Sequence, residues 1–197
     1  MLTKKQLAER MTGLGSSDAP VVLGVSKYKT PAGLFDEKVY GVVPTLDADG
    51  VRRCYWGDVL EPIILKETGK RLGVKVRKPK SMFRHATLPW MLANLDGLTD
   101  DGLIVECKNM QWPIKGNLTD HPYYYQVQHQ LAVMGTQHAF LATLIGGNDL
   151  KLYEIEADEQ VMRAMVDIEA RFWARVEAAR KELSHVPAHA HCHQALG

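Results

Sequence analysis

Long hydrophobic runs are missing from this sequence. No stretch of the 197 residues approaches the roughly 18 consecutive apolar residues that a membrane-spanning helix needs. The N-terminus also lacks the apolar segment of a secretory signal peptide. These two absences exclude a membrane protein and lead us to expect a cytoplasmic one.

Cysteine is scarce as well. The three cysteines, Cys54, Cys107 and Cys192, are odd in number and form no C-x-x-C pair. This pattern excludes a disulfide framework and disfavours an iron–sulfur cluster. The histidines near the C-terminus match no zinc-binding spacing. We therefore expect one domain over residues 1–184 and a flexible, histidine-containing tail over residues 185–197, with a zinc site in the tail as a weaker alternative.

An excess of charge of one sign is also absent. The net charge is only +1 at pH 7, which argues against a protein that coats nucleic acid. The charge is unevenly spread, because eight basic residues and one acid, Glu67, lie between Lys66 and Arg84. Such a basic block attracts phosphates, although a solvated surface explains it equally well. We expect residues 74–77 and 81–84 of this block to pair as an antiparallel ribbon.

A β-hairpin is predicted between residues 91 and 108. Two segments typical of strands, 91–95 and 103–108, flank the turn sequence Asp100-Asp101-Gly102. This arrangement would place Asp96 beside Glu106 at one end of a sheet.

The second strand of this hairpin ends in the sequence Glu106-Cys107-Lys108. Because side chains alternate between the faces of a strand, Glu106 and Lys108 point one way while Val105 and Cys107 point the other. Paired carboxylates bind Mg²⁺, and Mg²⁺ activates water and neutralises the charge that develops on a phosphate. A lysine beside them adds a positive charge. Taken alone, the same residues are more often a surface ion pair than a catalytic site.

Helical patterns are predicted on both sides of a polar loop near residue 45. Thr30 and Pro31 begin a helix that reaches Tyr40. A second helix is expected over residues 52–68, with a kink or a restart at Pro62 because proline lacks a backbone N–H. Its apolar side chains, together with Glu61, are expected to face mostly inward: Tyr55, Trp56, Leu60, Ile63, Ile64 and Leu65.

A helix over residues 123–134, ending at Gly135, carries three closely spaced glutamines. Gln126 and Gln130 share one side of it because they lie four positions apart. The remaining predicted elements are a helix over residues 3–12, a hairpin formed by 138–146 and 150–156, and a long helix that Asp158 caps and that runs to about Leu183.

The order of these elements and five of their motifs resemble the lambda-exonuclease and YqaJ-type viral recombinase nucleases of the PD-(D/E)XK superfamily. The resemblance covers about residues 10–156. It departs from the family pattern at Leu95, where a proline usually precedes the catalytic aspartate. The matching motifs are Arg10 with Gly13-Leu14-Gly15-Ser16-Ser17-Asp18, Tyr28-Lys29-Thr30-Pro31, Trp56-Gly57-Asp58-Val59-Leu60-Glu61, Asp96-Gly97 with Glu106-Cys107-Lys108, and Tyr125-Gln126-Val127-Gln128.

The resemblance implies an α/β fold with a restriction-endonuclease-like core, in which helices flank a central mixed β-sheet. It also implies a metal site in which Asp96, Glu106, the backbone carbonyl of Cys107 and Glu61 hold two Mg²⁺ ions, with Mn²⁺ as a possible substitute. Lys108 and Gln126 would then orient the nucleophile in this catalytic group.

The implied activity is metal-dependent hydrolysis of double-stranded DNA from its ends. The resemblance favours 5′-to-3′ exonuclease action that leaves 3′ single-stranded overhangs for phage-type recombination, with Arg10 and Ser17 binding the 5′-phosphate. It further implies a homotrimer, a single-strand annealing protein as partner, and a phage or prophage gene expressed in the bacterial cytoplasm.

Two other functions fit the same residues. A structure-specific or restriction-type endonuclease would use the same metal site but would also cut closed circular DNA. A non-enzymatic module that binds DNA ends would need Arg10 and the basic block but would show no metal-dependent turnover.

Overall fold

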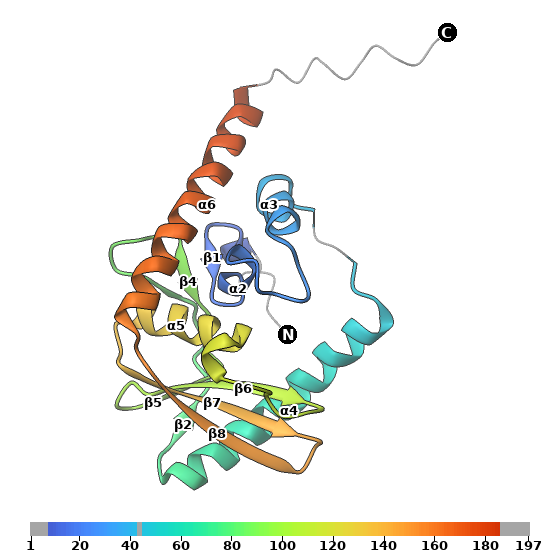
Figure 1. Ribbon diagram of the computed structural model, residues 1–197, viewed down its shortest axis with the longest axis vertical. Coiled ribbons are helices and arrows are strands. Elements are labelled where there is room, and N and C mark those ends of the chain that lie inside the picture. The colour runs from blue at the N-terminus through green and yellow to red at the C-terminus, as the bar shows by residue number, and fades with distance from the viewer. Residues whose placement is uncertain (1–7, 43–44, 186–197) are drawn as a thin grey trace.

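Two β-sheets form the centre of the molecule, as the computed structural model shows for residues 8–42 and 45–185 (Figure 1). The larger sheet is mixed, because β6 and β7 run parallel whereas the other neighbouring strands are antiparallel. Its strands, in spatial order, are β2 (Val76–Arg77), β5 (Gly97–Thr99), β6 (Ile104–Met110), β7 (His138–Ile145) and β8 (Asp149–Glu156).

The smaller sheet contains the first strand of the chain and has three short strands. Its central strand pairs in parallel with one neighbour and antiparallel with the other. In spatial order the strands are β1 (Leu14–Gly15), β4 (Met91–Ala93) and β3 (Phe83–Arg84). This second sheet was not anticipated from the sequence.

Helices cover both faces of the larger sheet. On one face, Val105 and Cys107 of β6 pack against Ile64 and Leu65 of a long helix. On the other face, Ile104 packs against the apolar side of a second helix. The helices are α2 (Ala19–Val22), α3 (Pro31–Tyr40), α4 (Ala48–Leu72), the short 3₁₀ helix η1 (Leu118–Asp120), α5 (Pro122–Met134) and α6 (Glu159–His185). The predicted mixed sheet flanked by helices is therefore confirmed, with α4 on one face and α5 on the other.

Local capping signals set several helix ends where the sequence predicts them. The Thr30 side chain accepts a hydrogen bond from the Gly33 N–H at 3.1 Å at the start of α3. Asp158 does the same for the Val161 N–H at 3.0 Å at the start of α6. Gly135 ends α5 with a φ of 64°, in the left-handed region that glycine adopts readily.

The predicted strand pairing around residue 91 is wrong in one respect. The hairpin partner of β6 is β5, whereas residues 91–93 form β4 in the smaller sheet. The chain crosses from one sheet to the other between these strands, and Asp96 lies at the crossing. The ribbon expected from residues 74–77 and 81–84 is also wrong, because β2 pairs with β5 and β3 pairs with β4. Each of these two segments pairs with a strand later in the sequence instead of with the other segment.

Helix α4 differs from the prediction in continuity and in burial. It is one helix through Pro62, without the restart given as the alternative to a kink, and its C-terminal half packs on the sheet through Ile64 and Leu65. Its N-terminal half extends beyond the sheet (Figure 1). For this reason Tyr55 and Trp56 are exposed rather than inward-facing, and Ile63, next to the buried Ile64, is exposed as well.

The two chain ends are described only in part. Residues 8–10 are helical, and the rest of the helix expected over 3–12 is either outside the described residues or a turn. The predicted tail lies outside them as well, apart from His185, which ends α6. None of the described helices combines the length and the apolar character that a membrane crossing requires.

Candidate active site

Two carboxylates meet where the chain enters the larger sheet. Asp96 directly precedes β5, and Glu106 lies in β6, whose Val105 pairs with Gly97. The Cys107 N–H donates a hydrogen bond to Asp96 Oδ2 at 2.9 Å, which ties the two strands together at this point. Gly97 follows Asp96 for a steric reason, since a Cβ atom there would lie 2.5 Å from Leu65 Cδ2.

Glu106 is held by three donors in a buried position. The residue is only 2% exposed. Its Oε1 accepts hydrogen bonds from Lys108 Nζ and Gln126 Nε2, both at 2.5 Å, and its Oε2 accepts one from Gln130 Nε2 at 2.6 Å. Both glutamines come from the same side of α5, as their spacing predicts. The carboxylate therefore has a fixed orientation.

The charge at this site is not balanced. Burial is the main cause that raises the pKa of Asp96 to about 8, and the nearby negative charge of Glu106 raises it further. Burial works against the ammonium of Lys108, but Glu106 and Asp96 outweigh it and raise the pKa of Lys108 above its usual value. Lys108 is consequently a permanent cation at neutral pH and not a proton acceptor.

A third acid, Glu61, reaches the site from α4. Its side chain is 14% exposed and forms an ion pair with Lys78 Nζ. Burial opposes the charge of Lys78, but Glu61 and then Asp96 outweigh it and raise its pKa. The charge of Glu61 also contributes to the raised pKa of Asp96. The structure thus brings Glu61 into the same electrostatic environment as Asp96 and Glu106.

The donor set suits a hard cation. Carboxylate oxygens are the ligands that Mg²⁺ and Mn²⁺ prefer, and a cation would relieve the repulsion between the buried Asp96 and Glu106. Within residues 8–42 and 45–185, no three His, Cys, Asp or Glu side chains are close enough to enclose a metal ion by themselves. A cation at Asp96 and Glu106 would therefore take further ligands from backbone, water or substrate, as Mg²⁺ commonly does. The Cys107 side chain packs into the core on the other face.

Arg10 and Ser17 also lie together, in a second polar group. Arg10 Nη2 donates to Ser17 Oγ at 2.9 Å and lies 3.2 Å from Asp18 Oδ1. Lys38, whose side chain is completely buried, lies 2.9 Å from Asp18 Oδ2. Burial opposes the charge of Asp18, but Lys38 and Arg10 outweigh it and lower its pKa. Arg10 is thereby held in place beside the exposed Ser17 hydroxyl.

Sequence reasoning missed several residues of these two groups. Gln130 was recognised as a neighbour of Gln126 but was not assigned to the site, although the i, i+4 spacing was the signal. Lys78 belongs to the basic block, and nothing local marks it as the partner of Glu61. Lys38 has no sequence signal at all, because its partner Asp18 is brought to it only by the packing of α2 and α3.

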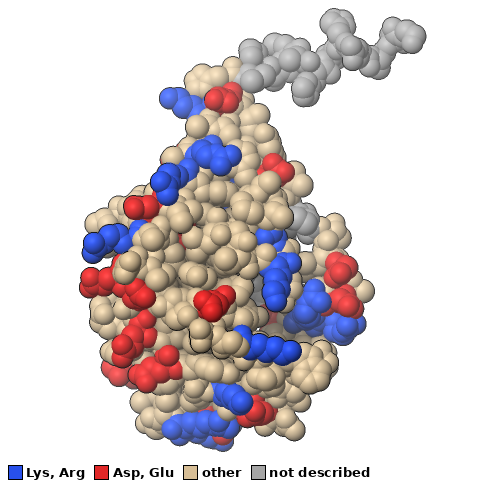
Figure 2. Space-filling model, in the orientation of Figure 1, with Lys and Arg blue, Asp and Glu red and all other residues tan. Residues whose placement is uncertain are grey.

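The basic block does not form one continuous positive surface. Several of its members are paired within the chain: Lys70 and Arg71 with Glu67, Arg77 with Asp100, and Lys78 with Glu61. On the face in Figure 2, Lys and Arg side chains alternate with Asp and Glu side chains. The block is therefore mostly a mixed-charge surface.

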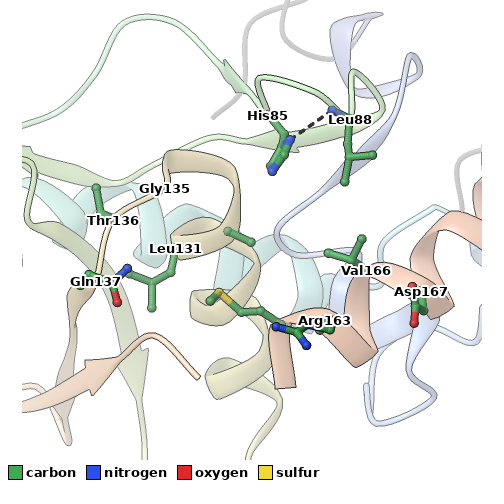
Figure 3. Close-up of a pocket in the computed structure, with 11 residues that line it drawn as sticks. His85, Leu88, Leu131, Gly135, Thr136, Gln137, Arg163, Val166 and Asp167 are labelled. Carbon is green, nitrogen blue, oxygen red and sulfur yellow. Dashed lines mark hydrogen bonds between the residues drawn. The ribbon is translucent and has the colours of Figure 1, made fainter. Parts of the chain in front are cut away.

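A separate pocket of about 370 Å³ lies between the C-terminal end of α5 and the first half of α6 (Figure 3). Leu131 and Val166 give it an apolar wall. The His85 ring at its edge accepts a hydrogen bond from the Leu88 N–H at 3.1 Å and so closes a turn. None of the carboxylates of the candidate site lines this pocket.

Comparison with known proteins gives a match over most of the chain. The family model described as the YqaJ-like viral recombinase domain matches residues 6–137. The protein YqaJ of Bacillus subtilis (strain 168) is 37% identical over 176 residues, which cover 85% of this chain and 54% of that protein. The chain thus spans about half the length of this curated relative.

Solved structures show the same fold at lower sequence identity. The alkaline exonuclease LHK-Exo from Laribacter hongkongensis aligns with a TM-score of 0.74 and 19% identity over 92% of this chain and 96% of that one. A phage-related exonuclease from Haemophilus somnus 129PT aligns with a TM-score of 0.64 and 14% identity over 87% of this chain and 96% of that one. These matches confirm the predicted α/β fold.

Proposed function

Because this chain belongs to the YqaJ-like viral recombinase family, we propose that it is a DNA exonuclease whose active centre is formed by Asp96, Glu106 and Lys108. One observation carries the proposal: two buried carboxyl groups that disfavour each other's ionisation lie beside a permanent ammonium. Burying such a pair is costly for the fold, and strongly shifted pKa values of this kind gather at functional sites. The proteins of similar fold include an alkaline exonuclease and a phage-related exonuclease.

We propose that Asp96 and Glu106 bind Mg²⁺ or Mn²⁺, with the Cys107 carbonyl and Glu61 as further ligands. When bound, such ions activate water and neutralise charge on the phosphate under attack. Two ions, as the resemblance implies, would take most of their remaining ligands from water and from the phosphate.

The protein side chains would fix the geometry around that phosphate. Gln126 and Gln130 hold the two oxygens of Glu106, so that its carboxylate does not need to reorient during the reaction. Lys108 supplies a positive charge next to the carboxylates and helps to orient the attacking water. The raised pKa of Lys108 means that it stabilises charge and does not remove a proton.

Arg10 and Ser17 would recognise the end of the DNA. A guanidinium beside a hydroxyl suits a terminal 5′-phosphate, and Asp18 holds Arg10 in position for it. This assignment favours 5′-to-3′ degradation of double-stranded ends that leaves 3′ overhangs for phage-type recombination. Assembly as a homotrimer, a single-strand annealing partner and a role in the cytoplasm of a phage-infected or lysogenic bacterium belong to the same proposal.

A digest of two substrates tests the proposal. Linear duplex DNA carrying a 5′-phosphate at one end only and a closed circular duplex are incubated with Mg²⁺ and with the wild type, Glu106→Gln or Glu67→Gln. Glu67 lies on the exposed surface of α4 and serves as the matched control. Loss of the phosphorylated strand alone, with an inactive Glu106→Gln and an active Glu67→Gln, is the expected result.

The other outcomes are equally informative. Nicks in the circle would show the endonuclease alternative, which uses the same carboxylates. Binding of DNA ends without any metal-dependent product would favour the non-enzymatic end-binding module.

A further inference from the structure

Exposed aromatic side chains gather on one side of the candidate site. Tyr28, in the loop between α2 and α3, is 78% exposed, and Trp56, in the projecting half of α4, is 48% exposed. Large aromatic rings that remain this accessible outside the core mark a surface on which something binds. Trp56 is exposed because the half of α4 that carries it extends beyond the sheet.

These rings are organised by neighbouring side chains. The Arg53 guanidinium lies 5.8 Å from the centre of the Tyr28 ring. Trp56 is three positions after Arg53 and therefore lies on the same side of α4, one turn further along. The edge-to-face contact between the rings of Trp56 and Tyr55, with centres 5.5 Å apart, helps to hold the indole in its orientation.

A further contact between a cation and an aromatic ring lies beside the carboxylates. Lys108 Nζ lies 4.9 Å from the centre of the Tyr123 ring at the start of α5. Burial raises the pKa of the Tyr123 phenol, and the neighbouring Tyr28 adds to this rise while Lys108 opposes it. Burial and then the positive charge of Lys27 lower the pKa of His121, two residues before Tyr123. Helix α2 contacts α5, and the loop with Lys27 and Tyr28 directly follows α2. This packing, together with the effects of Lys27 and Tyr28 on His121 and Tyr123, places the loop near the start of α5 and the active centre.

We propose that Tyr28, Arg53, Trp56 and Tyr123 form an aromatic strip that stacks on unpaired nucleotides of the DNA strand entering the active centre. The inference rests on the proposed nuclease function and adds a binding surface to it. Aromatic faces with an interspersed cation are the elements with which proteins hold single-stranded DNA, because every base has a face to stack on and every linkage has a negative charge.

The position of the strip explains why unpaired nucleotides are its ligand. Glu106 is buried, and α4 and α5 lie on the two faces of its sheet, so a phosphate reaches it more readily from a separated strand than from an intact duplex. The positive charges of Lys27 and Arg53 favour the DNA backbone over an apolar protein partner.

Binding to a normal and an abasic oligonucleotide tests the strip. Fluorescence anisotropy is measured in EDTA, without divalent metal, on a labelled single strand of about 12 thymidines and on a strand of equal length and charge without bases. The wild type should bind the thymidine strand about tenfold more tightly or better, since stacking contributes measurably for each base. Trp56→Ala and Tyr28→Ala should each weaken that binding about five- to tenfold and leave abasic binding unchanged.

Two control variants separate stacking from other effects. Tyr28→Phe keeps the ring and should bind like the wild type. Tyr40→Ala removes another tyrosine, 56% exposed at the end of α3, and should also bind like the wild type. Denaturation midpoints of all variants show whether any loss of binding comes from unfolding.

Equal affinity of the wild type for both strands, or unchanged binding by both Trp56→Ala and Tyr28→Ala, would overturn the strip. The nuclease proposal is tested separately. A wild type that binds the thymidine strand more tightly than the abasic strand in EDTA, but degrades no DNA with Mg²⁺, would support the strip and contradict the nuclease function. A wild type that degrades DNA, together with strip variants that bind the thymidine strand normally, would support the nuclease function and contradict the strip.

Discussion

The molecule contains two buried groups of charged side chains whose charge balance differs. The carboxylate site sets three acids, Asp96, Glu106 and Glu61, against two lysines. The paired cluster, formed by Arg10, Asp18, Lys38, His129 and Glu169, instead gives each acid its own cationic partner. Helix α5 takes part in both, with Gln126 and Gln130 at the first and His129 at the second.

Because of this difference, we expect one cluster to contribute mainly to stability and the other mainly to activity. In the paired cluster, removal of a charge takes a partner away from a buried opposite charge, which destabilises a fold. At the carboxylate site the acids repel one another, so the fold would be more stable without one of them, and a bound cation would favour the ionised form of Asp96. The same kind of substitution should therefore affect stability in one cluster and catalysis in the other.

The largest effect is expected from Lys108→Met. It removes the cation that touches Glu106 and should lower the rate of DNA hydrolysis at least about a hundredfold, because a preorganised charge beside the phosphate is lost. Rates under single-turnover conditions measure it. Lys181→Met, on the exposed part of α6, is the control and should keep full activity; a Lys108→Met variant as fast as this control would contradict the assignment.

Lys38→Met should have the largest effect on stability. The variant leaves Asp18 buried with Arg10 as its remaining partner, and we expect a loss of about 3 kcal/mol in the free energy of unfolding. Urea denaturation measures this loss. A cost as small as that of Lys181→Met would show that the paired cluster does not stabilise the fold.

The pair of His129 and Glu169 should make stability depend on pH. Burial opposes the imidazolium, but Glu169 and the Leu92 carbonyl, with Asp18 nearby, outweigh it and raise the pKa of His129 above its usual value. Its contribution is therefore complete below the unfolded pKa of about 6.5 and is lost as pH rises through the folded pKa, by at most about 1.4 kcal/mol per pH unit.

Urea denaturation between pH 6 and pH 8 measures this dependence. Glu169→Gln should reduce the slope to the part that Asp96 contributes, since the raised pKa of Asp96 also makes stability fall as pH rises towards about 8. A change at the exposed His138, which lies 4.0 Å from Glu154, should leave the slope intact. A wild type whose stability rises over this interval would contradict the pairing.

The smallest effect on stability, and one of opposite sign, is expected from Asp96→Asn. In EDTA at pH 7 the variant should be more stable than the wild type by about 1 kcal/mol, because burial and Glu106 both disfavour the carboxylate. It should also be inactive. A destabilised Asp96→Asn would show that the carboxylate site stabilises the fold as the paired cluster does.

The sequence predicts best what neighbouring residues determine. The caps at Thr30 and Asp158, the alternation of Glu106 and Lys108, and the shared side of Gln126 and Gln130 follow from local periodicity, and all are found in the structure. These local rules place the central part of the active centre correctly.

Contacts between distant segments were not predictable in the same way. The pairing of Glu61 with Lys78 depends on how α4 lies against β2, and that of Asp18 with Lys38 on how α2 meets α3. The exposure of Trp56 depends on where α4 leaves the sheet, which no helical periodicity reports. The charge balance of both clusters therefore emerges only in three dimensions.

The parallel pairing of β6 and β7 has a consequence for the order in which the protein folds. Helix α5 connects these strands, so the hydrogen bonds from Gln126 and Gln130 to Glu106 close loops of only 20 and 24 residues. The bond from Arg180 to the Met11 carbonyl closes a loop of 169 residues, at an additional entropic cost of about 2 kcal/mol. We expect the catalytic geometry to form early around β6, α5 and β7, and the N-terminal segment to join α6 afterwards.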